Sequence, residues 1–437
     1  LPPISRWRSK GIKIDRSICP EEQTHVHHVN KKLGLYEGQS KLQRLPVPTL
    51  KSSIQRCLDS LRGGVASARA LETLEVLGAQ MLDTNTSDGK ASKQLQEALL
   101  ARAEECASAT DYPNCSWIES WWDQVAYLSV RDSTAINSNF FGTCFEGERL
   151  SDSRLCLAAS CIHAILYFKQ LTDSGELHPD CLDRKGAIPL CSFQYTRLFC
   201  HSRVPGRQCD SLVGFDDVRH IAIHMHGFWF KLDVCAKSAS GQLQYLNPIQ
   251  IYHSLAAIEQ DAKKLLAAAK NQATPTDQVA ILSSENRTRW AQVREECLLT
   301  DRVNARSLNF LESAMFHASF SALKPTTLAE IMVSAECGDL ERGDYFFDKP
   351  STVFFFANNL VGFGGEHGHA DAPVPARMMN AMAYRVVSDG WLDKLEAHER
   401  NHHENAQETM AAAARFEYLQ WRVSDSLAQA ISDAKKR

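Results

Sequence analysis

The sequence lacks the features that would assign it to a membrane, nucleic-acid or zinc-binding class. No uninterrupted apolar run approaches the roughly 18 residues of a membrane-spanning helix, and the longest candidate, Val353–Ala357, has the length of a strand. A net charge of -4 provides no strong field for nucleic acid or for an anionic membrane. There is no Cys-x-x-Cys pair and no low-complexity tract, so nothing indicates a common zinc site or a disordered repeat.

What the chain does have is the composition of a large globular protein. Its 437 residues are 44% hydrophobic and 23% charged, which allows a large core divided among two or three ordinary domains. The fourteen cysteines are scattered, and we interpret them as reduced and mostly buried thiols. Histidines gather at His25, His27 and His28, but no cysteine or carboxylate cluster accompanies them, so we expect no metal site.

Helical and strand patterns are mixed along the chain without strict alternation. Apolar residues recur at helical spacing over residues 50–77, with a break at Gly63-Gly64, and again over 91–107, 155–171, 254–270 and 308–316. The segment after Gly390 also predicts helices. Ser116 followed by Glu119 has the pattern of a capping box and predicts a helix start.

Two regions have the rhythm of strands. Residues 220–226 and 229–234 alternate on either side of Gly227 and predict a hairpin, while residues 346–360 predict a buried strand. Helices and strands in this order favour an α+β fold, in which a mixed sheet is covered by helices.

One segment carries most of the chemical information. In Gly365-Glu366-His367-Gly368-His369-Ala370-Asp371 a carboxylate follows a histidine by four residues. A histidine can take the proton of an alcohol, and a carboxylate can hold the imidazole in one tautomer and stabilise its cation. Gly364-Gly365 allows close packing of the backbone. We interpret His369 as a solvated loop residue and a poor rival for the base.

This segment, together with others in the same order, resembles the choline/carnitine acyltransferase family. The resemblance covers about residues 43–425 and implies a fold like one half of a carnitine acyltransferase, similar to chloramphenicol acetyltransferase. The matching segments are Leu45-Pro46-Val47-Pro48, Trp121-Trp122 with Ala126-Tyr127-Leu128 and Arg131, Pro189-Leu190, Gln194-Tyr195, Leu198-Phe199, Arg203-Val204-Pro205-Gly206 with Asp210, Leu282–Arg294, and Phe347-Asp348-Lys349.

The resemblance also implies roles for single residues. The family moves an acyl group between a coenzyme A thioester and the hydroxyl of carnitine or choline. In these terms His367 would be the general base and Asp371 its orienting carboxylate. Tyr127 matches a family tyrosine that contacts the carboxylate end of carnitine, and packing against Trp121 or Trp122 is the equally open alternative.

The resemblance further predicts how the chain is organised. In the family, a lysine segment that grips coenzyme A and a Ser-Thr-Ser motif that stabilises the oxyanion belong to a second half, which we expect to lie outside this chain. We expect an extended arm over residues 1–42, the acyltransferase-like domain over 43–400 and a helical tail over 401–437. The basic, hydroxyl-rich opening Ser5–Lys10 is typical of what remains of an organelle-targeting peptide.

Two hypotheses for function stand nearly level. In the first, the chain is a structural accessory subunit of a larger mitochondrial assembly, with little or no catalysis of its own. Asp344-Tyr345-Phe346, where the family has Asn-Arg-Trp, favours this pseudoenzyme hypothesis. In the second, it is half of a split acyltransferase, and a second chain supplies coenzyme A binding and oxyanion stabilisation. The retained His367 and Asp371 favour this one, while a sensor of carnitine ranks below both.

Both hypotheses share their expectations about ligands and partners. The partners would be other protein chains and not nucleic acid, and no transmembrane segment is expected. No cofactor would be bound, and a coenzyme A thioester would be a co-substrate only after a second chain completes the site.

Overall fold

A computed structural model describes residues 28–437, except residues 31, 40–41, 65–66, 109–115, 184–186, 238–242, 270–277 and 403–413. The chain divides into two compact units. Unit 1 comprises Leu1–Tyr36 and Gln124–Arg437, and unit 2 comprises Glu37–Asp123. Most of the arm expected over residues 1–42 lies outside the described residues.

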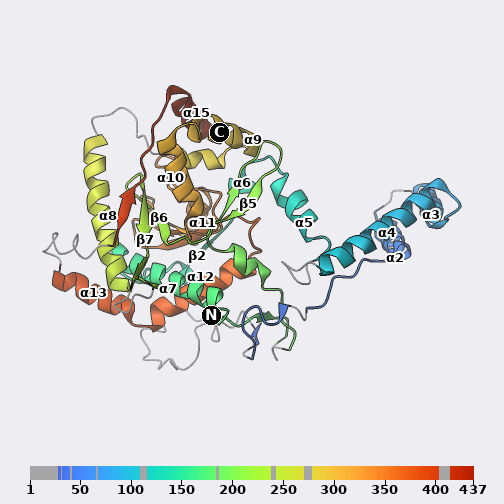
Figure 1. Ribbon diagram of the computed structural model, residues 1–437, viewed down its shortest axis with the longest axis horizontal. Coiled ribbons are helices and arrows are strands. Elements are labelled where there is room, and N and C mark those ends of the chain that lie inside the picture. Colours follow the sequence, from blue (N-terminus) through green and yellow to red (C-terminus); the bar gives the residue numbers. More distant parts are fainter. Residues whose placement is uncertain are drawn as a thin grey trace. The chain divides into compact units, whose positions relative to one another are not determined.

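Unit 1 is built around a seven-stranded mixed sheet (Figure 1). Strands β6, β10 and β11 run parallel, and their neighbours run antiparallel to them. The expected hairpin is β6–β7, in which Met225 lies opposite Phe228. The order across the sheet is β13 (Phe416–Tyr418), β7 (Phe228–Asp233), β6 (His220–Met225), β10 (His317–Phe320), β11 (Thr352–Phe355), β12 (Val361–Gly365) and β2 (Phe140–Thr143).

Helices cover both faces of this sheet (Figure 1). Successive strand residues point to opposite faces, so Ile221 and Ile223 enter one core and Ala222 the other. This arrangement confirms the α+β fold of a mixed sheet covered by helices. The first core is shared with α7 (Arg154–Ser174), α8 (Pro248–Ala269), α12 (Pro373–Ser388) and α13 (Trp391–His402), and the opposite face carries α9 (Arg287–Val293), α10 (Arg302–Ser313), α11 (Leu328–Cys337) and α15 (Asp425–Lys436).

Short elements complete unit 1. Three small antiparallel pairs are β1 (His28–Val29) with β3 (Asp180–Cys181), β4 (His201–Val204) with β5 (Ser211–Gly214), and β8 (Cys235–Lys237) with β9 (Leu243–Tyr245). The short helical segments are α6 (Thr134–Asn137), η4 (Phe145–Gly147), η5 (Phe193–Arg197), η6 (Gln278–Ser284) and η7 (Arg294–Leu298). Another, η3 (Asp123–Leu128), starts at the last residue of unit 2.

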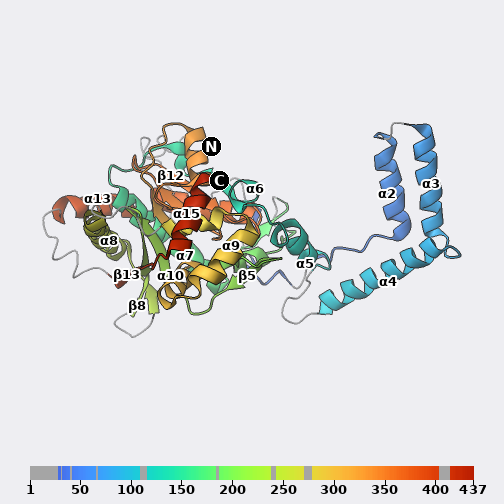
Figure 2. The same cartoon turned by 90° about the horizontal axis from the view of Figure 1, so that it is seen from above.

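Unit 2 consists mainly of three helices, α2 (Leu50–Arg62), α3 (Ala68–Leu82) and α4 (Ser87–Ser108). Figure 2 shows α2 and α3 side by side, joined at the predicted break Gly63-Gly64. Thr49 and Ser67 cap the two N-termini, because their hydroxyls accept from the backbone N–H groups of the third residue on.

Three local predictions were wrong. The strand expected over 346–360 is only Thr352–Phe355, because the residues before it form a turn that carries buried charges. The tail contains a strand, β13, which pairs with β7. The short helix α5 (Glu119–Trp122) has Ile118 and not Ser116 at its N-cap, so the helix starts without a side-chain cap.

Helix α7 is the one helix in the described ranges that is long and apolar enough to cross a membrane. However, 78% of its apolar window is buried inside the protein, and a buried core helix meets the same criteria. The described cysteines are free thiols, and four of them are buried: Cys144, Cys156, Cys161 and Cys181. The other described cysteines are partly buried or exposed, so the expectation of mostly buried thiols was wrong.

Candidate functional site

The candidate base His367 lies just beyond the end of strand β12. The strand ends at Gly365, opposite Phe140 of the edge strand β2, and α12 begins at Pro373. A Cβ atom on Gly365 would lie 2.2 Å from the Pro350 carbonyl oxygen and 2.7 Å from the Phe140 ring. Only glycine therefore fits where the chain enters the His367 turn, as the sequence indicated.

The imidazole of His367 is held between aromatic rings and still reaches solvent. Its ring centroid lies 5.2 Å from that of Tyr127 and 5.9 Å from that of Phe140, both edge-to-face. The His367 side chain is 33% exposed, and its Nε2 lies 3.8 Å from Asp371 Oδ1. An accessible imidazole with a carboxylate beside it can accept a proton and have the resulting cation stabilised.

A glutamine fixes the carboxylate of Asp371. The Gln194 amide donates through Nε2 to Asp371 Oδ2 at 2.9 Å, and its Oε1 accepts from the Asp371 backbone N–H at 2.9 Å. The other oxygen, Oδ1, is the one nearest His367. In the sequence, Gln194 belongs to a family-like block without an assigned role. In the structure, its side chain holds both the carboxylate and the backbone N–H of Asp371.

Glu366, the residue before the candidate base, is a fully buried carboxylate. Arg203 Nη1 donates to its Oε1 at 2.8 Å, and His369 Nδ1 lies 2.6 Å from its Oε2. Burial raises the pKa of Glu366, but His369 and Arg203 together outweigh burial and hold it well below its usual range. The interpretation of His369 as a solvated loop residue was wrong, because its side chain is buried beside this carboxylate.

A buried ionic network lies behind Glu366. Asp210 accepts from Arg203 Nε at 2.7 Å, from Arg287 Nε at 2.7 Å and from Arg131 Nη2 at 2.8 Å. Burial raises the pKa of Asp210, but the arginines hold it below its ordinary value. Arg287 also donates to Asp348, where burial prevails and raises the pKa to about 6. Several of these residues belong to the family-like segments of the sequence, and no pattern in those segments predicts that they meet.

A small cavity of about 260 Å³ opens beside His367. Tyr127, Thr134 and Ser138 line it, and the buried hydroxyls of Thr134 and Ser138 have no hydrogen-bond partner among the described residues. The cavity is smaller than the ~300–1,000 Å³ of typical ligand pockets. It could hold part of an acceptor alcohol but not a long acyl chain.

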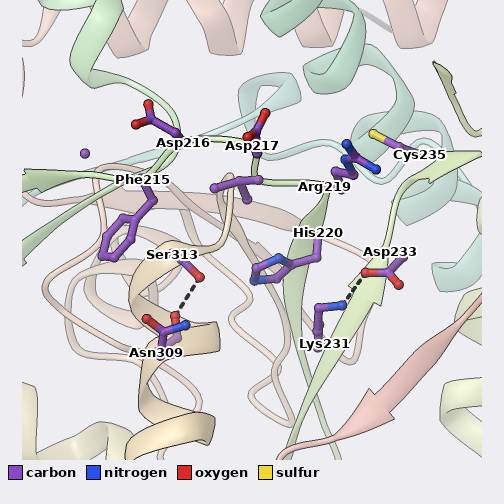
Figure 3. A pocket seen from close by; sticks show the side chains of 12 residues that line it. Phe215, Asp216, Asp217, Arg219, His220, Lys231, Asp233, Cys235, Asn309 and Ser313 are labelled. Carbon is purple, nitrogen blue, oxygen red and sulfur yellow. Dashed lines mark hydrogen bonds and ion pairs between the residues drawn. The ribbon is translucent and has the colours of Figure 1, made fainter.

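A larger polar cavity of about 720 Å³ lies at the ends of β6 and β7 (Figure 3). Of the lining residues, Lys231 forms an ion pair with Asp233, and the Ser313 hydroxyl donates to the Asn309 carbonyl oxygen. Nε2 of His220 contacts the Phe310 carbonyl, and burial lowers the pKa of this histidine to about 4. Because these side chains are engaged with the protein itself, the candidate base remains His367.

Among the described residues, no three histidine, cysteine or acidic side chains converge as the ligands of a metal ion would. His25 and His27 lie outside the described residues, and of His28 only the backbone is described, in strand β1.

Comparisons with known proteins match most of the chain. The family model for choline/carnitine O-acyltransferases matches residues 45–437. Carnitine O-palmitoyltransferase 1, liver isoform, of Homo sapiens is 28% identical over 354 residues, covering 80% of this chain and 42% of that protein. The muscle isoform of Sus scrofa is 25% identical over 347 residues, covering 78% and 41%. Carnitine O-acetyltransferase of Rattus norvegicus is 27% identical over 361 residues, covering 79% and 53%. The chain therefore spans about half the length of these relatives.

Proposed function

This chain belongs to the choline/carnitine acyltransferase family, and on that premise we propose that it contributes the general base to acyl transfer from a coenzyme A thioester to an alcohol. The observation that carries the proposal is the setting of His367. Its imidazole is partly exposed, lies between two aromatic rings and has the Asp371 carboxylate 3.8 Å away. Asp371 in turn is fixed by Gln194.

The proposed chemistry follows from those positions. His367 takes the proton of the acceptor hydroxyl as its oxygen attacks the thioester carbonyl. The tetrahedral intermediate collapses, the carbon–sulfur bond breaks, and the imidazolium returns the proton to the leaving thiolate. Asp371 stabilises the imidazolium between these two steps, and Tyr127 contacts the acceptor in the neighbouring cavity.

The proposal divides the work between this chain and another segment or chain. The base and its orienting carboxylate belong here, while coenzyme A binding and oxyanion stabilisation are supplied by a partner. Carnitine is the proposed acceptor, because the relatives are named carnitine O-palmitoyltransferase and carnitine O-acetyltransferase. A mitochondrial location is part of the same proposal.

Replacement of the base is the direct test. We expect His367→Ala to lower turnover by about 100- to 10,000-fold, the range for loss of a positioned general base. Thiol release from acetyl- and palmitoyl-coenzyme A with carnitine would be measured on the natively purified protein with its co-purifying chains. His226→Asn is the control, since it removes an imidazole from the β6–β7 turn, where asparagine tolerates the positive φ. Unchanged turnover in His367→Ala would refute the proposal.

A second candidate is a structural accessory subunit with little catalysis of its own. Apolar side chains exposed on unit 1, among them Val125, Ile136 and Leu182, favour it, because exposed apolar surface often marks a protein partner. This candidate predicts a wild-type complex that releases no thiol and an identical subunit composition with His367→Ala. Mass spectrometry of both native complexes distinguishes it from the first candidate.

A further inference from the structure

Three arginines converge on one buried carboxylate, Asp210, but only one of them continues towards the candidate base. Arg287 goes on to Asp348, and Arg131 goes on to the carbonyl oxygens of Leu128 and Gly206. Arg203 instead donates through its two remaining nitrogens to Glu366, which precedes His367, and to Tyr127, which packs against His367. Of the three arginines, Arg203 is the one whose Nη1 and Nη2 groups donate to residues beside His367.

Both outer contacts of Arg203 are short and adjacent to the imidazole. Nη1 donates to Glu366 Oε1 at 2.8 Å, and Glu366 directly precedes His367 in the chain. Nη2 donates to the Tyr127 backbone carbonyl at 2.7 Å, and the Tyr127 ring centroid is 5.2 Å from that of His367. One guanidinium thus joins the segment that carries the base to the segment that packs against it.

The space between these segments is tight. A Cβ atom on Gly368 would lie 3.2 Å from both carboxylate oxygens of Glu366 and 3.4 Å from Tyr127 Cβ. The two segments therefore approach each other closely beside His367, and Arg203 is 2% exposed beneath them. A shift of either segment would move the imidazole against its aromatic neighbour.

We propose that Arg203 is a positioning residue that fixes the imidazole of His367 relative to Tyr127 and Asp371. The inference rests on the proposed function, in which His367 is the base. Its Nε donates to Asp210, which Arg131 and Arg287 also hold, so the guanidinium has a rigid anchor. A guanidinium presents its donors in a fixed planar fork, whereas a lysine ammonium is a point charge that cannot reproduce three directed bonds.

The test compares two buried arginines that differ only in their outer contacts. In Arg203→Lys we expect loss of the nuclear Overhauser contacts between the His367 and Tyr127 rings, measured with ring-labelled histidine and tyrosine. Arg287→Lys is the matched control, because Arg287 also lies 2.7 Å from Asp210 Oδ2 and is also buried. It should lower the unfolding midpoint comparably while the ring contacts persist.

Turnover adds a second readout in the natively purified protein. Arg203→Lys should lower kcat by about 10- to 100-fold, because a misplacement of about 1 Å can cost ~100-fold. The KM for the thioester should not change, since Arg203 is not proposed to bind it. A merely structural role would move the unfolding midpoint alone.

The outcomes separate this inference from the proposed function. Ring contacts that persist in Arg203→Lys, or that vanish equally in Arg287→Lys, overturn the role of Arg203 whatever the turnover. A wild-type protein without turnover overturns the proposed function. The ring contacts in Arg203→Lys and Arg287→Lys still decide whether Arg203 positions His367. Should Arg203→Lys fail to fold, Glu366→Asp replaces it, since it keeps the charge but shortens the reach to Nη1. Persistent ring contacts there overturn the inference as well.

Discussion

The helices of the two units differ both in sequence pattern and in burial. In unit 1, two-thirds of α7 is buried, including Leu157, Ile162 and Phe168. In unit 2, α2 has no buried residue and α3 has only Gly78. Helix α7 is apolar on nearly all sides, which is the pattern of a helix buried in a core, whereas α2 has one apolar side and is otherwise polar. The sequence pattern therefore distinguishes a buried helix from a helix at the surface. We expect unit 2 to open more easily, because few buried apolar contacts oppose its unfolding.

The ion pairs of the two units also differ in burial. Unit 1 buries Arg203, Asp210 and Glu366 in one network behind the candidate base. In unit 2 the pair of Arg62 and Glu75 is about half exposed and 3.3 Å apart, an arrangement that contributes little to stability. Directed buried contacts hold side chains in one geometry, which a catalytic site requires. The candidate site accordingly lies in unit 1.

The largest expected difference comes from adding one methyl group to a glycine in each unit. Gly365→Ala should lower the free energy of unfolding by about 4 kcal/mol or more, because the new Cβ would meet the Pro350 backbone oxygen at 2.2 Å. Gly78→Ala should change it by less than about 1 kcal/mol, since the gain of ~1 kcal/mol in helix propensity offsets the tight contact with Ile54 Cγ2 at 3.0 Å, which a small shift of the half-exposed helix pair can relieve. Urea denaturation followed by circular dichroism measures both.

Equal effects of the two substitutions would break the comparison. In particular, a Gly365→Ala variant with an unchanged midpoint would mean that β12 can shift away from Pro350 at little cost. The close approach of β12 would then not explain the glycine before the His367 turn.

Mild acid should lower the stability of unit 1 through its buried histidines, an effect that unit 2 cannot show because it has no histidine. Burial lowers the pKa of His220 to about 4 and that of His224 to about 3. At these two histidines the folded pKa values lie below the unfolded value of about 6.5, so the unfolded chain binds more protons there, and their contribution to stability falls as pH drops below 6.5. Asp348 acts in the opposite direction, because burial raises its pKa to about 6 and the folded chain binds that proton first. Between pH 6.5 and 5 each histidine should cost unit 1 up to about 2 kcal/mol. Residues 37–123, which make up unit 2, contain no histidine.

Hydrogen exchange from pH 7 to pH 5, corrected for the intrinsic rates, measures this difference unit by unit. His224→Leu is the informative variant, because the imidazole of His224 is fully buried and its pKa is lowered the further of the two. It should reduce the pH dependence of unit 1 by the share of His224, while His220 keeps its own. An equal loss of protection in both units would contradict the assignment to histidines.

Local sequence patterns predicted those parts of the fold that depend on neighbouring residues. The helix break at Gly63-Gly64 and the hairpin around Gly227 are confirmed, because periodicity and turn residues specify both. Strand β13 was missed because its pairing with β7 joins residues 184 to 188 positions apart in the sequence, from Phe416 with Leu232 to Tyr418 with Phe230. The strand over 346–360 was overextended because its apolar residues continue into a turn whose direction is set by buried charges such as Asp348.

In the candidate site, too, local patterns indicated neighbouring residues but not contacts between distant ones. The spacing of His367 and Asp371 and the family resemblance drew attention to these two residues, and they lie close together in the structure. Their roles remain predictions. The contacts that fix them, from Gln194 to Asp371 and from Arg203 to Glu366, join residues 177 and 163 positions apart. No local pattern could have indicated those pairs or the burial of His369.

The smallest expected difference concerns one hydroxyl at the start of a helix in each unit. Thr49 Oγ1 caps α2 by accepting from Ser52 N–H at 3.2 Å, and Thr49→Ala should cost about 1 kcal/mol. Ser153 Oγ caps α7 in the same way but also donates to Glu399 Oε1 at 2.7 Å. Ser153→Ala should therefore cost about 2 kcal/mol, since a hydrogen bond to a charged group adds to the cap. Hydrogen exchange in the first turns of α2 and α7 measures the two losses separately. Equal losses would mean that the contact with Glu399 contributes nothing, and that the two units cap their helices with equal strength despite their different burial.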